Sequence, residues 1–147
     1  SIAEEMPDWT ITATDMSLLA LQTAKINSRG LKNINFVQCF WLNSIGASFD
    51  IIVSNPPYIC RNDPHLENLS FEPRIALEGG EDGLSPAREI IRRAKTNLVE
   101  KGHLYLEHGH NQKDDVVQIL REHAFFQINT YQDLAGHDRV IRAIYDS

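Results

Sequence analysis

Cysteine is scarce in this sequence, and two patterns that mark membrane or secreted proteins are missing. The two cysteines, Cys39 and Cys60, form no CxxC pair, so we expect a reduced, cytoplasmic setting. No apolar run approaches the length of a membrane-spanning helix. The first residues lack the basic, apolar and small-residue order of a signal peptide. We therefore expect no partnership with a membrane.

Basic residues are outnumbered by acidic ones, 14 to 20, which gives a formal net charge of −6. Binding to a nucleic-acid duplex usually needs a concentrated basic face. The one short basic stretch, REIIRRAK at 88–95, has the pattern of the solvated face of a helix. We therefore expect no direct binding of nucleic acid.

The 147 residues, 42% of them hydrophobic, fit one domain with a real core. Short apolar runs alternate with helical periodicity, which predicts an α/β fold with a largely parallel sheet. Helices are expected to begin at Ser17, at Ser85-Pro86 and at Asn111, where small polar residues can act as N-caps. Strands are expected at 9–15, 34–38, 49–54 and 103–109, followed by an antiparallel pair at 125–133 and 138–146.

The segment from 55 to 84 has no regular pattern and holds four of the six prolines. Loops of this length inside compact domains are usually functional or disordered. The loop opens with Asn55-Pro56-Pro57-Tyr58, directly after the apolar run FDIIVS. Because ligands in open α/β sheets bind beyond the carboxyl ends of strands, this tetrapeptide is a candidate binding site.

The residues of this tetrapeptide are suited to binding one kind of ligand group. Pro56 and Pro57 fix two successive φ angles and remove two N–H donors. The Asn55 side-chain oxygen and a proline carbonyl then form a pair of acceptors, which suits a planar NH2 group, and Tyr58 adds an aromatic wall. Such a site could hold an amide or aromatic amine nitrogen for direct attack on an activated methyl group. The alternative is an ordinary turn that ends a strand.

With this motif the sequence resembles the class I methyltransferases that use S-adenosylmethionine. More narrowly, it resembles the release-factor glutamine-N5 methyltransferases, the HemK family. The segments IVSNPPYI, DPHL, FEP, LEHG and DLAGHDRV occur in that family in this order. The resemblance implies a Rossmann-like sheet with a C-terminal antiparallel hairpin. It also implies methylation of the glutamine in the Gly-Gly-Gln motif of a peptide chain release factor, the expected partner.

The resemblance also assigns roles to individual residues. It implies that Asn55 and the carbonyl of Pro56 hold the glutamine NH2 group, while Pro57 and Tyr58 shape the slot. Asp15 would accept hydrogen bonds from the ribose hydroxyls of the cofactor, and without the resemblance it could be a surface acid before a helix. Cofactor contacts are thus expected from Asp15, Trp41 near the adenine, and Asn55. Trp41 could equally be a core residue.

Two departures from the family pattern carry consequences. Phe40 stands where the family has an acid, so a polar contact near the adenine would be lost. The family's N-terminal helical domain, first strand and glycine-rich cofactor loop precede the helix that SIAEEMPD (1–8) resembles. We therefore expect residues 1–147 to form a partial catalytic domain with two unpaired strand edges and weak or absent cofactor binding.

Two other functions remain open at this stage. An adenine-N6 methyltransferase acting on DNA or RNA shares the tetrapeptide, although the acidic balance and the lack of a target-recognition insertion count against it. A non-catalytic remnant that only folds or binds a partner is the other alternative.

Several residues around the motif have both functional and ordinary interpretations. His108 and His110 lack a matching set of ligands, so we expect no metal site. Glu107 and His108 could line the site or be structural. Arg139 could form a salt bridge with a nearby acid. The acidic, glycine-rich segment 78–84 is a poor phosphate-binding loop and is expected to flank the substrate slot.

Overall fold

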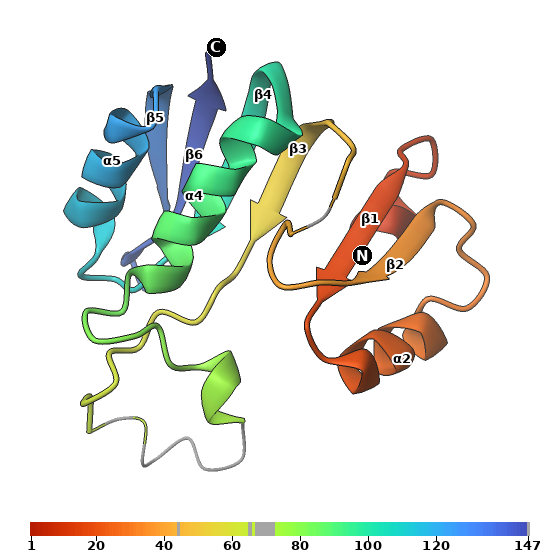
Figure 1. The fold of residues 1–147 in the computed structure, drawn as a ribbon, viewed down its shortest axis with the longest axis horizontal. Helices are drawn as coiled ribbons and strands as arrows, with labels where there is room; N and C mark the ends of the chain where they lie inside the picture. The colour runs from red at the N-terminus through yellow and green to blue at the C-terminus, as the bar shows by residue number, and fades with distance from the viewer. Residues whose placement is uncertain (44, 65, 67–72, 147) are drawn as a thin grey trace. The chain divides into compact units, whose positions relative to one another are not determined.

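The computed structural model describes residues 1–43, 45–64, 66 and 73–146. Of the motifs quoted above, DPHL and FEP fall partly outside these residues, at position 65 and at positions 71 and 72. The chain divides into two compact units, Ser1–Ile45 and Gly46–Ser147, and each is described by itself (Figure 1).

The first unit is a two-stranded parallel sheet with helices. Strand β1 (Ile11–Asp15) pairs in parallel with β2 (Ile34–Gln38), and helix α2 (Leu18–Asn27) connects them. The Ser17 side chain accepts a hydrogen bond from Ala20 N at 3.2 Å, which confirms the predicted N-cap. The short helix α1 (Ile2–Glu5) is tied to the sheet because Asn33 Nδ2 donates to the carbonyls of Ala3 and Met6.

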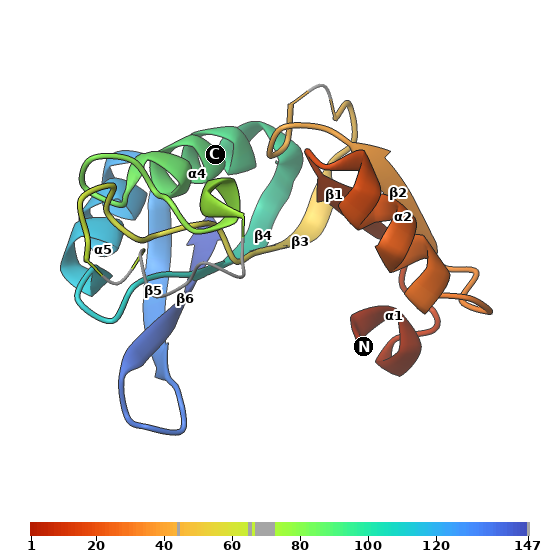
Figure 2. The same ribbon diagram turned by 90° about the horizontal axis from the view of Figure 1, so that it is seen from below.

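The second unit contains a four-stranded sheet in the order β3-β4-β6-β5. Strand β3 (Phe49–Ser54) is parallel to β4 (Leu98–Glu107), while β6 (Asp138–Tyr145) is antiparallel to both β4 and β5 (Phe125–Gln132). The predicted α/β fold with parallel strands and a C-terminal antiparallel hairpin is confirmed. Figure 2 shows this hairpin running beyond the rest of the unit to its turn.

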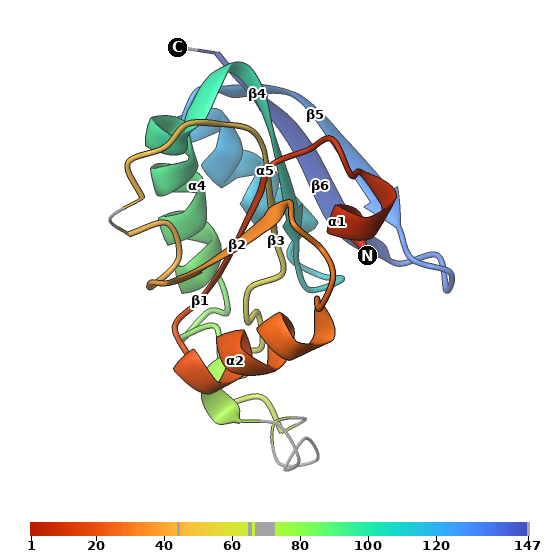
Figure 3. The same cartoon turned by 90° about the vertical axis from the view of Figure 1, so that its right-hand side faces the viewer.

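Helices α4 (Ser85–Asn97) and α5 (Lys113–Glu122) lie on the same face of this sheet (Figures 1 and 3). They form the core there, because their apolar side chains and those of the central strands are almost inaccessible to solvent. Burial of each large apolar side chain stabilises the fold by about 1.5–3 kcal/mol, which holds the ends of β3 and β4 in place. The core residues with exposures of 2% or less include Ile90, Ile91, Ala94, Val116 and Leu120 from the helices and Leu104, Leu106, Ile141 and Ala143 from the strands.

Several predicted boundaries differ from the structure, among them the starts of α4 and α5 and both ends of β4. Helix α4 has Leu84 as its N-cap rather than Ser85, with no side-chain cap, and Leu84 N donates to Asp82 Oδ1 at 3.0 Å. The position before α5 is Gln112 rather than Asn111. Strand β4 starts at Leu98, where it pairs with β3, and ends at Glu107, so that LEHG lies half beyond the strand. A short 3-10 helix, η1 (Arg74–Ala76), interrupts the long loop.

Candidate active site

The Asn55–Tyr58 corner follows β3 at the carboxyl end of that strand, as predicted. Pro56 is buried, while the Asn55 side chain is exposed. Within the described part of the chain, neither the Asn55 carboxamide nor the Pro56 carbonyl has a hydrogen-bond partner. The two acceptors predicted for an NH2 group thus lie on a stiff backbone, one on an exposed residue and one on a buried residue.

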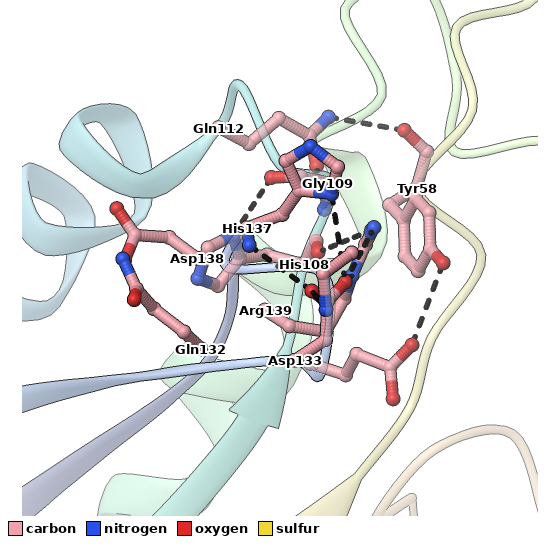
Figure 4. A network of polar contacts seen from close by, with 11 residues as sticks. Tyr58, His108, Gly109, Gln112, Gln132, Asp133, His137, Asp138 and Arg139 are labelled. Carbon is pink, nitrogen blue, oxygen red and sulfur yellow. Dashed lines mark hydrogen bonds and ion pairs between the residues drawn. The ribbon is translucent and has the colours of Figure 1, made fainter.

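Tyr58 is held from three directions (Figure 4). Its hydroxyl donates to Glu107 Oε1 at 3.4 Å, and its carbonyl accepts from Gln112 Nε2 at 3.0 Å. The Arg139 guanidinium carbon lies 6.0 Å from the centre of its ring, at the limit of a cation–π contact. Burial, and then the negative charge of Glu107, raise the pKa of the Tyr58 phenol, whereas Arg139 opposes them. The phenol therefore stays neutral at physiological pH.

The segment 78–84 lies along the residues that follow the corner. Gly79 N donates to the carbonyl of Ile59 at 2.8 Å, Ile59 N donates to Leu77 O at 3.0 Å, and Arg61 N donates to Gly80 O at 2.8 Å. Gly83 has a φ of +73°, and an added Cβ would lie 2.4 Å from the Tyr58 carbonyl oxygen. The glycine-rich composition of this loop thus serves close packing against the corner.

Arg139 connects the corner to the turn of the β5–β6 hairpin. Its guanidinium contacts Asp133 Oδ2 at 3.4 Å, so the predicted ordinary alternative, a salt bridge, is present. Asp133 Oδ1 also accepts from the backbone N–H groups of Ala135 and His137. These backbone hydrogen bonds, with Arg139, lower the pKa of the Asp133 carboxyl group. Asp133 therefore stays ionised and fixes both the turn and Arg139.

His108 is 1% exposed and lies just beyond β4. Its Nδ1 lies 2.8 Å from Gly109 O, so this nitrogen carries the proton and donates. Its Nε2 has no hydrogen-bond partner among the described residues. Burial lowers the pKa of the imidazole, so His108 is neutral at pH 7. Among the described residues no group of three or more His, Cys, Asp or Glu could hold a metal ion.

The first unit carries the other two predicted site residues, at the carboxyl ends of its paired strands. Asp15 is exposed, with Oδ1 accepting from Ser17 N at 2.7 Å, and its main-chain carbonyl accepts from Cys39 N at 3.1 Å. Trp41 is half-buried, and its ring centre lies 5.4 Å from that of Phe40. A carboxylate is a suitable acceptor for a ribose diol and an aromatic ring a suitable surface for an adenine, the two parts that the resemblance assigns to these positions.

Three residues that the sequence did not single out contribute to the site: Gly83, Gln112 and Asp133. The sequence shows that segment 78–84 is rich in glycine, but it does not show that Gly83 packs against the carbonyl of Tyr58. Gln112 follows LEHG closely, yet its position before a helix indicated only a helix start. The Asp133 interactions are local, and the turn pattern DLAGH could have identified them.

The fold and the corner together define a class of protein. The chain has the fold of the class I S-adenosylmethionine-dependent methyltransferases. It superposes on a methyltransferase from Pyrococcus furiosus with a TM-score of 0.75, at 16% identity, covering 99% of this chain and 68% of that one. The family described as methyltransferase small domain matches residues 1–69.

Two other relatives are named for one particular class of methyltransferase. The chain is 42% identical over 146 residues to the release factor glutamine methyltransferase of Coxiella burnetii, covering 97% of this chain and 53% of that protein. It also matches the structure of a release factor-specific protein-(glutamine-N5) methyltransferase from Alicyclobacillus acidocaldarius, with a TM-score of 0.51, 23% identity and coverage of 99% and 90%. The predicted resemblance is confirmed, and the chain spans about half the length of the curated relatives it matches.

No helix among the described residues is long and apolar enough to cross a membrane.

Proposed function

We propose that the protein containing these residues transfers a methyl group from S-adenosylmethionine to a glutamine side-chain nitrogen, in the Gly-Gly-Gln motif of a peptide chain release factor. The proposal depends above all on the Asn55-Pro56 pair of acceptors, which lies on a backbone stiffened by proline and has no hydrogen-bond partner among the described residues, with Asn55 exposed and Pro56 buried. Similarity to release factor glutamine methyltransferases over nearly the whole chain supports the choice of substrate.

The corner's task is to hold one nitrogen. Asn55 Oδ1 and the Pro56 carbonyl accept the two hydrogens of the glutamine NH2 group, and this fixes the direction of the nitrogen lone pair. Acceptors on both hydrogens also favour the positive charge that develops on nitrogen as it forms its new bond. Tyr58 and Pro57 form the walls of the slot, and the neutral phenol adds no competing charge.

The residues that follow β1 and β2, or end them, would bind the cofactor. The Asp15 carboxylate would accept the ribose hydroxyls, and Trp41 would contact the adenine, with Phe40 beside it in place of an acid. S-adenosylmethionine, when bound, supplies a methyl group on a positively charged sulfur. The additional proton left on the methylated nitrogen is lost afterwards, so no strong base is needed before the bond forms.

Methylation of a release factor by the full-length gene product tests the proposal. Transfer of labelled methyl to the wild-type factor, and not to one with Gly-Gly-Ala in the motif, is the expected result. Asn55→Ala should lower kcat/KM by about 100-fold, the scale for removing one preorganised hydrogen-bonding group. Asn62→Ala is the matched control, because Asn62 is an exposed asparagine in the same loop. Methylation of adenine in an oligonucleotide instead of the factor would overturn the proposal.

A further inference from the structure

Gln112 is only 6% exposed, and its carboxamide bridges two backbone groups (Figure 4). Gly109 N donates to Gln112 Oε1 at 2.9 Å, and Gln112 Nε2 donates to the carbonyl of Tyr58 at 3.0 Å. Because an N–H group can only donate and a carbonyl can only accept, the orientation of the carboxamide is fixed. Gln112 thus joins the loop after β4 to the last residue of the Asn55–Tyr58 corner.

The bridge is enclosed by the segment 78–84. A Cβ added to Gly83 would lie 2.4 Å from the Tyr58 carbonyl oxygen and 2.5 Å from Gln112 Nε2, closer than real Cβ atoms come. The absence of a side chain at residue 83 therefore allows the loop to close over the bridge. Loss of the amide donor would leave the Tyr58 carbonyl without that partner in an enclosed place, which is costly.

We infer that Gln112 is a positioning residue for the reaction at the corner, an inference that rests on the proposed function. It holds the main chain at Tyr58, and two prolines of fixed φ connect Tyr58 to Asn55. Gln112 touches neither substrate nor cofactor in this role; it sets where Asn55 Oδ1 and the Pro56 carbonyl stand relative to the end of β4. Misplacement of reacting groups by about 1 Å can cost about 100-fold in rate.

Gln112→Glu separates positioning from packing because its effect depends on pH. The ionised carboxylate keeps the acceptor for Gly109 N but offers no hydrogen to the Tyr58 carbonyl, whereas the protonated carboxyl restores an O–H donor. Burial raises the pKa of such a glutamate above its ordinary value of about 4.3. Relative to wild type, kcat should fall about tenfold near pH 8 and recover as the pH is lowered to about 5.5, with KM changing less than about twofold.

Two further variants complete the kinetic test. Gln118→Glu places the same charge on the exposed face of α5, where Gln118 Nε2 donates to Glu122 Oε1 at 2.9 Å, and its activity relative to wild type should be the same at every pH. Gln112→Met, of similar size but without the amide, should lower kcat about tenfold at every pH. A pH-independent ratio for Gln112→Glu, or wild-type kcat for Gln112→Met, would overturn the inference.

A measurement on the wild-type protein covers the case in which the variants fail to fold. By NMR, the side-chain amide hydrogens of Gln112 should exchange with solvent at least about tenfold more slowly than those of Gln118, because they are enclosed and hydrogen-bonded. Equal exchange rates would refute the bridge. A wild-type protein that does not methylate the release factor would refute the proposed function, while the exchange rates would still decide whether the bridge exists.

Discussion

The hydroxyl of Tyr58 donates a hydrogen bond to Glu107 Oε1 at 3.4 Å, across 49 residues of sequence. Tyr58 ends the corner after β3, and Glu107 ends the neighbouring parallel strand β4. The carboxyl ends of two adjacent strands are thus connected by a side-chain contact at the candidate site. The phenol held by this carboxylate keeps its proton, and in the proposed function it is a fixed wall of the substrate slot.

Replacing Glu107 with glutamine should lower the pKa of the Tyr58 phenol. Burial remains and still raises this pKa, but the negative charge beside the phenol is removed while Arg139 continues to favour the phenolate. Titration of labelled tyrosine by NMR would measure the change. Glu100→Gln, at an exposed position on the same strand, should leave the Tyr58 pKa as it is. A Tyr58 pKa that is equal or higher in Glu107→Gln would contradict this description of the site.

Asp15→Asn should weaken binding of S-adenosylhomocysteine to the full-length protein by about 10- to 100-fold, the range for losing a hydrogen bond to a charged group. The asparagine oxygen can still accept from Ser17 N, so the start of α2 is preserved. Calorimetry measures the affinity, and Asp8→Asn, at another exposed aspartate of this unit, serves as control. Equal affinities for Asp15→Asn and wild type would remove Asp15 from the cofactor site.

His108 should make stability depend on pH below about 6.5, the ordinary pKa of histidine. Because burial lowers its pKa in the folded protein, the unfolded chain takes up a proton first as the pH falls. Its contribution to stability is therefore complete above about pH 6.5 and is lost as the pH falls toward the folded-state pKa. In urea unfolding, the drop in unfolding free energy between about pH 7.5 and 5 should be smaller for His108→Gln than for wild type. The exposed His110→Gln should behave as wild type does.

Strand β3 and the C-terminal hairpin of the second unit could be predicted because their causes are local, whereas the bounds predicted for β4 were wrong. The run from Phe49 to Ser54 is apolar almost throughout, and Pro56 and Pro57 cannot continue a ladder, so the strand end and the corner were both located correctly. The cap at Ser17 was equally local. These features depend on neighbours within a few residues.

The residues that support the corner could not be predicted, because their partners are distant in sequence. Gln112 contacts Tyr58 across 54 residues, and nothing in the local pattern indicates that its amide faces a carbonyl. The start of α4 was misplaced by only one residue, because Ser85 is the first helical residue and Leu84 the N-cap. The separation into two sheets was anticipated only through the resemblance to a family with a strand between β1 and β3.

Gly83→Ala should destabilise the second unit more than Gly136→Ala does. Both glycines have positive φ, +73° and +83°, so alanine at either position carries the left-handed strain of about 1–2 kcal/mol. At Gly136 the new methyl group meets nothing within 4 Å, whereas at Gly83 it meets Tyr58 O and Gln112 Nε2. Overpacking of this kind adds about 1–3 kcal/mol. Urea midpoints at unchanged m-value measure the difference. If the two variants lost the same stability, the loop would not be closed over the Gln112 bridge, and the corner would lack the rigid support assigned to it.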